Sequence, residues 1–134
     1  MSSVSEALHL FSEPLLVRDI EGDGNCLFRS LSYAITGEED QHAVIRSLIC
    51  DYDGINEKTG DVSMRLDKVW GTTTEILAAA KLFHVNVFVW AKFGPTYSWH
   101  VHKLKDIMVN ESVYLENKSG LHFNVVLRAA DCGL

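Results

Sequence analysis

Apolar residues recur at helical spacing in three segments, which predicts helices over residues 26–35, 40–51 and 76–83. The positions expected to face the core are Leu27, Leu31, Ala34 and Ile35 in the first helix, Val44, Ile45, Leu48 and Ile49 in the second, and Ile76, Leu77, Ala80 and Phe83 in the third. Gly37 is suited to end the first helix, and Thr72 with Glu75 has the spacing of a capping box before the third. A short helix is also predicted near residues 4–11, ahead of Pro14.

Extended segments rich in β-branched and aromatic residues predict the strands. They cover residues 15–20, 85–90, 98–104, 112–116 and 121–127. Residues 85–90 are apolar on both faces, which is typical of an interior strand, and Gly94-Pro95 turns the chain toward the next strand. A short glycine-containing segment joins the last two strands, so they should form an antiparallel hairpin. The polar stretch 53–68 is expected to be the longest loop, with room for a short helical turn.

Composition narrows the class of protein. The chain has 134 residues, 47% of them hydrophobic, and no apolar run long enough to cross a membrane, so residues 1–134 are expected to form a single domain. The net charge is −6 and Lys and Arg are not clustered, which argues against binding to nucleic acid or to a membrane. Cys26, Cys50 and Cys132 follow no disulfide or zinc spacing. We expect a soluble monomer with reduced thiols inside the cell, in the cytoplasm.

A glycine-rich loop carries the first chemical signal. Gly22 and Gly24 flank Asp23 and would allow backbone conformations that a Cβ forbids, and Asn25 is a suitable N-cap for the helix that begins at Cys26. Unpaired N–H groups at a helix N-terminus favour a thiolate and would stabilise an oxyanion beside it. The loop alone fits a reactive cysteine and a buried structural cysteine equally well.

The last predicted strand carries the second signal. His122 and Asn124 are two residues apart, so their side chains project from the same face of the strand. A histidine can take the proton of a thiol, and an asparagine oxygen can hold the imidazole in the tautomer that this transfer needs. Spacing alone also fits a half-exposed histidine and a hairpin asparagine.

Two further histidines share a strand face. Trp99 and Val101 are expected to face one side of residues 98–104, and His100 and His102 the other. A His-x-His pair can bind a metal, but no third ligand is signalled nearby, so we expect a solvated strand face, no metal and no cofactor. Cys50 and His42, on or beside the second helix, are interpreted as a thiol at the edge of the core and a surface imidazole.

Three blocks together resemble one family. Residues 23–31 (DGNCLFRSL) resemble the nucleophile motif of the ovarian-tumour (OTU) cysteine deubiquitinases, and residues 121–126 (LHFNVV) resemble the histidine motif of that family. Between them, Trp70-Gly71 with Glu75, Ile76 and Ala78 resembles the middle block. The resemblance covers about residues 20–127, with the three blocks in the family's order.

The resemblance implies a papain-like α/β (α+β) domain of the OTU type, in which helices flank a small, mostly antiparallel sheet. It also implies a thiol isopeptidase that removes ubiquitin or a ubiquitin-like modifier. Its implied site residues are Cys26 as nucleophile, His122 as base and acid, Asn124 as orienting residue, Asp23 in support, the backbone of Asp23, Gly24, Asn25 and Cys26 as oxyanion hole, and Trp70, Trp99 and Phe123 as bulky walls of the cleft. Two alternatives stay open: a ubiquitin-binding module without turnover, and a thiol hydrolase that acts on a different acyl substrate.

Overall fold

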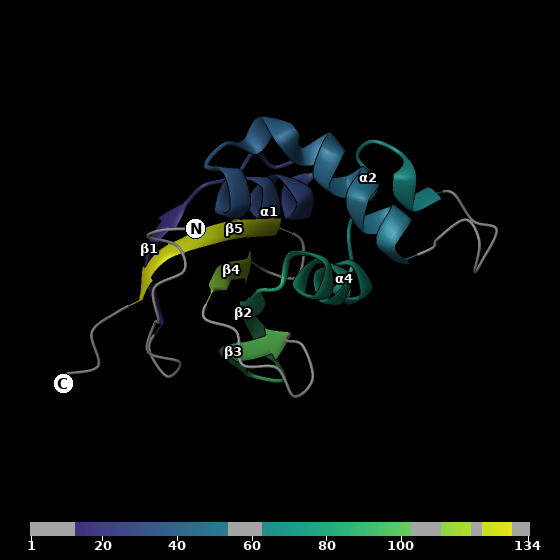
Figure 1. The fold of residues 1–134 in the computed structure, drawn as a ribbon. Coiled ribbons are helices and arrows are strands. Elements are labelled where there is room, and N and C mark those ends of the chain that lie inside the picture. The colour runs from purple at the N-terminus through teal and green to yellow at the C-terminus, as the bar shows by residue number, and fades with distance from the viewer. Residues whose placement is uncertain (1–12, 54–62, 103–110, 119–121, 130–134) are drawn as a thin grey trace.

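A computed structural model describes residues 13–53, 63–102, 111–118 and 122–129 (Figure 1). Its helices are α1 (Cys26–Thr36), α2 (His42–Asp53) and α4 (Thr73–Phe83), with 3-10 turns η2 (Glu39–Gln41) and η3 (Ser63–Arg65). Its strands are β1 (Pro14–Arg18), β2 (Asn86–Phe93), β3 (Thr96–His102), β4 (Ser112–Lys118) and β5 (His122–Ala129). None of the helices within these ranges combines the length and the apolar character that a membrane-crossing helix needs.

The five strands form one sheet in the order β1-β5-β4-β2-β3. The pairs β1–β5, β5–β4 and β2–β3 are antiparallel, and only β2 and β4 run parallel. The predicted hairpin of β4 and β5 and the mostly antiparallel sheet are therefore confirmed. Among the described residues, the first strand, β1, pairs along the sheet edge with the last strand, β5.

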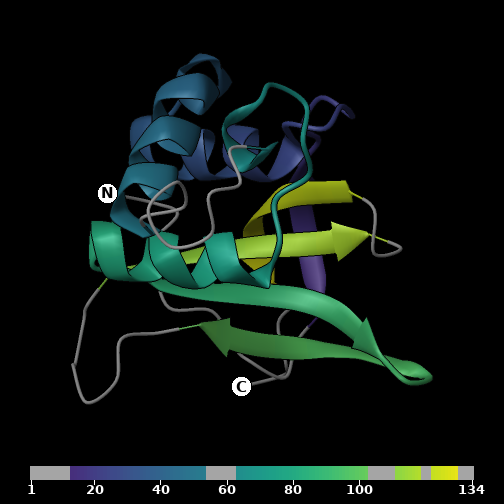
Figure 2. The same ribbon diagram turned by 90° about the vertical axis from the view of Figure 1, so that its right-hand side faces the viewer.

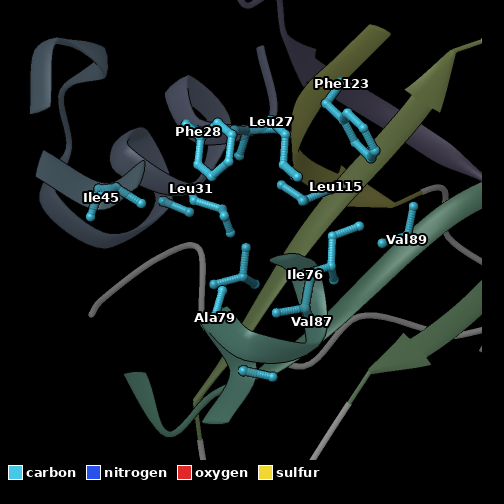
Figure 3. Close-up of a cluster of buried hydrophobic side chains, with 14 of the residues drawn as sticks. Leu27, Phe28, Leu31, Ile45, Ile76, Ala79, Val87, Val89, Leu115 and Phe123 are labelled. Carbon is cyan, nitrogen blue, oxygen red and sulfur yellow. The ribbon is translucent and has the colours of Figure 1, made fainter. Parts of the chain in front are cut away.

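The helices lie on one face of this sheet (Figures 1 and 2). Helix α1 rests over β5 and β4, and α4 lies over β2. Figure 3 shows the core between these layers, which includes Phe28 and Leu31 of α1 and Val87 and Leu115 of the sheet. Phe28, Leu31, Val87 and Leu115 are fully buried, so the hydrophobic effect fixes α1 against the sheet at this point.

The helices begin and end within three residues of their predicted bounds, and the expected local signals are present. Gly37 adopts the left-handed conformation (φ 87°) at the end of α1, and Thr72 with Glu75 forms the capping box of α4. The helical turn expected within residues 53–68 is η3. The helix predicted near residues 4–11 lies outside the described residues.

Three positions predicted to face the core are exposed instead. Val44 and Leu48 on α2 are 52% and 42% exposed, and Leu77 on α4 is 37% exposed. Neighbouring residues on a helix point about 100° apart, so a helix that lies on one layer can bury only part of a wide apolar stripe. On α2 the buried row is Ile45, Arg46, Ile49 and Cys50.

Strand β3 is oriented differently from the prediction. Val101 is 47% exposed, whereas His100 and His102 are half-buried. The two histidines pair with Val89 and Val87 of β2, so they continue the face of the sheet that the helices cover. The histidine face is thus half-buried and not fully solvated as predicted, because it continues the face of the sheet that the helices cover.

Candidate active site

Helix α1 begins at Cys26 and meets the start of β5. The Ser30 hydroxyl donates a hydrogen bond to the Phe123 carbonyl oxygen (3.3 Å), and the backbone of Phe123 is close enough to the Cys26 thiol to act on its pKa. The Cys26 side chain is 1% exposed. The fold thus brings the predicted cysteine and the predicted histidine strand together, from opposite ends of the described chain.

The protonation state of Cys26 differs from the expectation for a helix N-terminus. Burial raises the pKa of the Cys26 thiol, and the negative charge of Asp23 raises it further. Hydrogen bonds from the backbone at Phe123 and Leu27 act in the opposite direction without reversing the shift. A pKa above the ordinary value favours the thiol over the thiolate, so Cys26 depends on a base to act as a nucleophile.

This predicts how Cys26 reacts with a small alkylating agent. With the pKa of the thiol above its ordinary value, the rate of iodoacetamide alkylation should keep rising from about pH 6 to about pH 10. The rate would be measured by mass spectrometry in a Cys50→Ala, Cys132→Ala background, with Cys26→Ala as the blank. A rate that levels off below neutral pH would instead indicate a preformed thiolate and contradict the prediction.

His122 and Asn124 form the pair that the strand spacing predicts. His122 Nε2 lies 2.8 Å from Asn124 Oδ1, and the same oxygen accepts a hydrogen bond from the backbone N–H of Ile20 (2.8 Å). An amide oxygen only accepts hydrogen bonds, so Nε2 carries the ring hydrogen and Nδ1 keeps a free electron pair. The Nδ1 edge faces Gly22, where an added Cβ would lie 3.8 Å from Nδ1.

Asp23 braces the loop that leads to Cys26. Its Oδ1 accepts hydrogen bonds from the Asn25 N–H (2.9 Å) and from Arg29 Nε (3.2 Å), and its Oδ2 forms an ion pair with Arg29 (3.1 Å). Burial alone would raise the pKa of Asp23, but the hydrogen bonds from Arg29 and Asn25 and the charge of Arg29 outweigh burial and lower it. Among the described residues, the hydrogen bonds of Asp23 thus stay within the loop and α1.

Asn25 occupies the N-cap position but does not cap α1 with its side chain, so this prediction is wrong. Its Oδ1 instead accepts hydrogen bonds from Arg46 (2.8 Å) and from the Lys68 N–H (2.8 Å), and its Nδ2 donates to Asp67 (2.9 Å). The side-chain oxygen that would cap the helix is thus already hydrogen-bonded to Arg46 and Lys68. Asn25 ties the nucleophile loop to residues 67–68.

Arg46 is a buried charge that the sequence interpretation missed. It is 3% exposed, donates to the carbonyl oxygens of Met64 (2.9 Å) and Val69 (2.8 Å), and lies over the Phe28 ring, 4.1 Å from its centroid. Burial lowers the pKa of Arg46, and nearby acidic groups oppose that shift. The sequence did contain a signal for this burial: Arg46 precedes Ile49 by three residues and Cys50 by four, which places it on the same, inward face of α2.

The expected oxyanion hole is only partly free. The N–H groups of Asp23, Asn25 and Cys26 donate to Glu21 O (3.0 Å), Asp23 Oδ1 (2.9 Å) and Asp23 O (3.1 Å). Within the described residues, the Gly24 N–H is the member of the predicted set without a hydrogen bond. The oxyanion role of these four groups stays a prediction.

Two of the three predicted cleft residues line one cavity. It has a volume of about 500 Å³ and lies between the start of α4 and strands β2 and β3, with Trp70 and Phe123 in its wall. His100 and His102 line it too, and burial together with the charge of His100 lowers the pKa of His102.

The third predicted cleft residue, Trp99, lies on the other face of the sheet, edge-on to Trp90 and Tyr114. No group of three or more metal-ligating side chains occurs in the part of the chain described.

The fold defines the class first: an α/β domain in which α1 and α4 pack on one face of a five-stranded sheet and α2 packs on those two helices, with a cysteine at a helix N-terminus beside a histidine strand. Residues 21–123 match the family described as OTU-like cysteine protease. The chain belongs to this family.

Curated relatives and solved structures are similar to this chain in a way that agrees with this family. OVARIAN TUMOR DOMAIN-containing deubiquitinating enzyme 7 of Arabidopsis thaliana is 26% identical over 133 residues, which cover 89% of this chain and 35% of that protein. Enzyme 9 of the same series and organism is 31% identical over 93 residues, which cover 61% of this chain and 27% of that protein. The chain spans about a third of the length of these curated relatives.

Among solved structures, the OTU domain of OTUD1 superimposes with a TM-score of 0.69 at 25% identity, covering 81% of this chain and 83% of that chain. The Hazara virus OTU bound to ubiquitin gives a TM-score of 0.62 at 14% identity and covers 97% of both chains. The predicted fold class is confirmed.

Proposed function

We propose that this domain is a thiol isopeptidase that cleaves the bond after the C-terminal glycine of ubiquitin or of a ubiquitin-like modifier. The observation that carries the proposal is the 2.8 Å hydrogen bond between His122 Nε2 and Asn124 Oδ1, on the strand that meets the Cys26 thiol. Membership of the OTU-like cysteine protease family and the deubiquitinating relatives of Arabidopsis thaliana support ubiquitin as substrate.

In the first half of the reaction, His122 Nδ1 takes the proton of the Cys26 thiol, and the sulfur attacks the carbonyl carbon of the terminal glycine. The imidazolium that forms is held by its Nε2–H bond to Asn124 Oδ1. The substrate oxygen becomes an oxyanion, for which the Gly24 N–H is available as a donor. His122 then gives the proton to the leaving amine as the carbon–nitrogen bond breaks, which leaves a thioester on Cys26.

In the second half, His122 removes a proton from a water molecule that attacks the thioester carbonyl. The carbon–sulfur bond breaks, Cys26 recovers a proton from His122, and ubiquitin leaves as a carboxylic acid that releases its proton to the solvent. A thiol with a raised pKa suits this scheme, because it gives up its proton to the neighbouring base when it attacks. Asp23 contributes by holding the loop, through its bonds to Asn25 and Arg29.

The test uses ubiquitin that carries a C-terminal propargylamide, which forms a covalent bond with a thiol placed at the scissile position. The wild-type domain should gain the mass of one ubiquitin, the adduct should map to Cys26, and Cys26→Ala should stay unmodified. A panel of differently linked ubiquitin chains and two ubiquitin-like modifiers would then define the substrate.

Each result decides between functions. Labelling of Cys26 together with chain cleavage supports the proposal. Measurable ubiquitin affinity with no labelling would overturn it in favour of a binding module, and hydrolysis of a small thioester without any action on ubiquitin would indicate another acyl substrate.

A further inference from the structure

A carboxylate lies behind the histidine and asparagine pair. Glu116 of β4 is directly opposite Asn124 of β5 in the antiparallel register, and Asn124 Nδ2 donates a hydrogen bond to Glu116 Oε1 (3.3 Å). Asn124 itself is 3% exposed, so its amide exchanges few hydrogen bonds with water. The side chains therefore form a connected series from His122 through Asn124 to Glu116.

This series fixes which way the Asn124 amide points. Its oxygen receives two N–H groups, from His122 and Ile20, and its NH₂ group meets an acceptor that cannot donate when ionised. A flipped amide would direct NH₂ hydrogens at the Ile20 N–H and place its oxygen against the Glu116 carboxylate. Glu116 thus opposes the flip that would remove the acceptor of His122.

The same contact determines which residue the site accepts at position 124. An aspartate at position 124 would place its carboxylate against that of Glu116, and the two like charges would repel each other in a partly desolvated setting. The amide of Asn124 instead donates a hydrogen bond to Glu116. Strand β4 has hydrogen-bonded neighbours on both sides, so its backbone cannot shift to separate the two groups. The negative charge that an aspartate would place next to the imidazolium is here supplied one residue further away, by Glu116.

We propose that Glu116 is a positioning residue of this site: it orients Asn124 toward His122 and makes asparagine, and not aspartate, the residue that functions at position 124. The proposal rests on the proposed roles of Cys26, His122 and Asn124. It goes beyond them, because it predicts that two substitutions depend on each other in a stated direction.

The test is a double-mutant cycle of wild type, Glu116→Gln, Asn124→Asp and the double variant, assayed with a C-terminal fluorogenic amide of ubiquitin. Glu116→Gln keeps an acceptor for Asn124 Nδ2, so kcat should stay within about threefold of wild type. Asn124→Asp should lower kcat by about tenfold or more, because the introduced carboxylate would face Glu116. In the double variant the amide introduced at position 116 can donate to the carboxylate introduced at position 124, and kcat should return to within about threefold of wild type.

Several readouts separate positioning from a loss of fold. KM should change little across the four proteins, because the contact acts on the imidazole and not on ubiquitin binding. Asn86→Asp is the matched control, since Asn86 lies at the far end of the same sheet face, away from His122 and Asn124, and donates to the Ser112 hydroxyl (3.3 Å). It should keep wild-type kcat.

Alkylation of Cys26 by iodoacetamide measures the thiol and its base without any ubiquitin. If ubiquitin is not a substrate, the same order of the four proteins should still appear in the alkylation rate, so the two proposals can fail separately. The role of Glu116 would be overturned if the double variant lost as much kcat and as much alkylation rate as Asn124→Asp alone. Full activity of Asn124→Asp alone would overturn it too.

Discussion

Replacing His122 by alanine should lower kcat for a ubiquitin amide by about 10³-fold, because the Cys26 thiol then has no base to take its proton. Burial raises the pKa of that thiol, so little thiolate forms at neutral pH without help. Asn124→Ala should cost less, about 10–100-fold, since the imidazole remains but loses the partner that orients it. The assay is steady-state hydrolysis of the fluorogenic ubiquitin amide at saturating substrate.

Two controls keep this result specific to proton transfer. Added imidazole should restore part of the activity of His122→Ala and none of that of Cys26→Ala. Thermal unfolding of His122→Ala should match wild type, because the His122 side chain is only half-buried. If His122→Ala retained more than a tenth of wild-type kcat, a different group would have to act as base.

Gly24→Ala should unfold or distort the nucleophile loop. A Cβ at Gly24 would lie 1.7 Å from the Lys68 carbonyl oxygen and 2.4 Å from its carbon, both backbone atoms that cannot swing aside. Either the loop or residues 67–68 must move, and the Asn25 bonds to Asp67 and Lys68 are then lost. We expect a loss of about 3 kcal/mol in the free energy of unfolding and a fall of about 100-fold in kcat/KM.

Gly22→Ala is the matched comparison for stability. A Cβ there would lie 3.7 Å from His122 Cε1, an ordinary van der Waals distance. Its free energy of unfolding in urea should therefore stay within about 0.5 kcal/mol of wild type. Equal stability of the two variants would show that the close approach of Lys68 to Gly24 is not required.

These glycines illustrate what sequence reasoning can reach. Conformational freedom was the predicted reason for both, but the described glycines with positive φ are Gly37 and Gly94. Gly24 is required for space, and the atom that needs the space belongs to a residue far along the chain. The sequence of a loop alone does not predict which distant residue will pack against it.

The predictions that held rest on local geometry. The capping box of Thr72 and Glu75 and the shared face of His122 and Asn124 follow from the fixed spacing of helices and strands. Contacts between distant segments had no such signal: Arg46 reaches Asn25 across 21 positions, and Asn25 reaches Lys68 across 43. The raised pKa of the Cys26 thiol is of the same kind, because burial is a property of the assembled core.

The pairing of the first described strand with the last has a consequence for biosynthesis. The Ile20 N–H reaches Asn124 Oδ1 across 104 positions, and β1 closes the sheet only by pairing with β5. A chain still emerging from the ribosome presents Cys26 long before its base and its sheet partner exist. On the proposed mechanism, thiol hydrolysis must wait until synthesis has passed β5, and a nascent or prematurely terminated chain has Cys26 without the histidine proposed as its base.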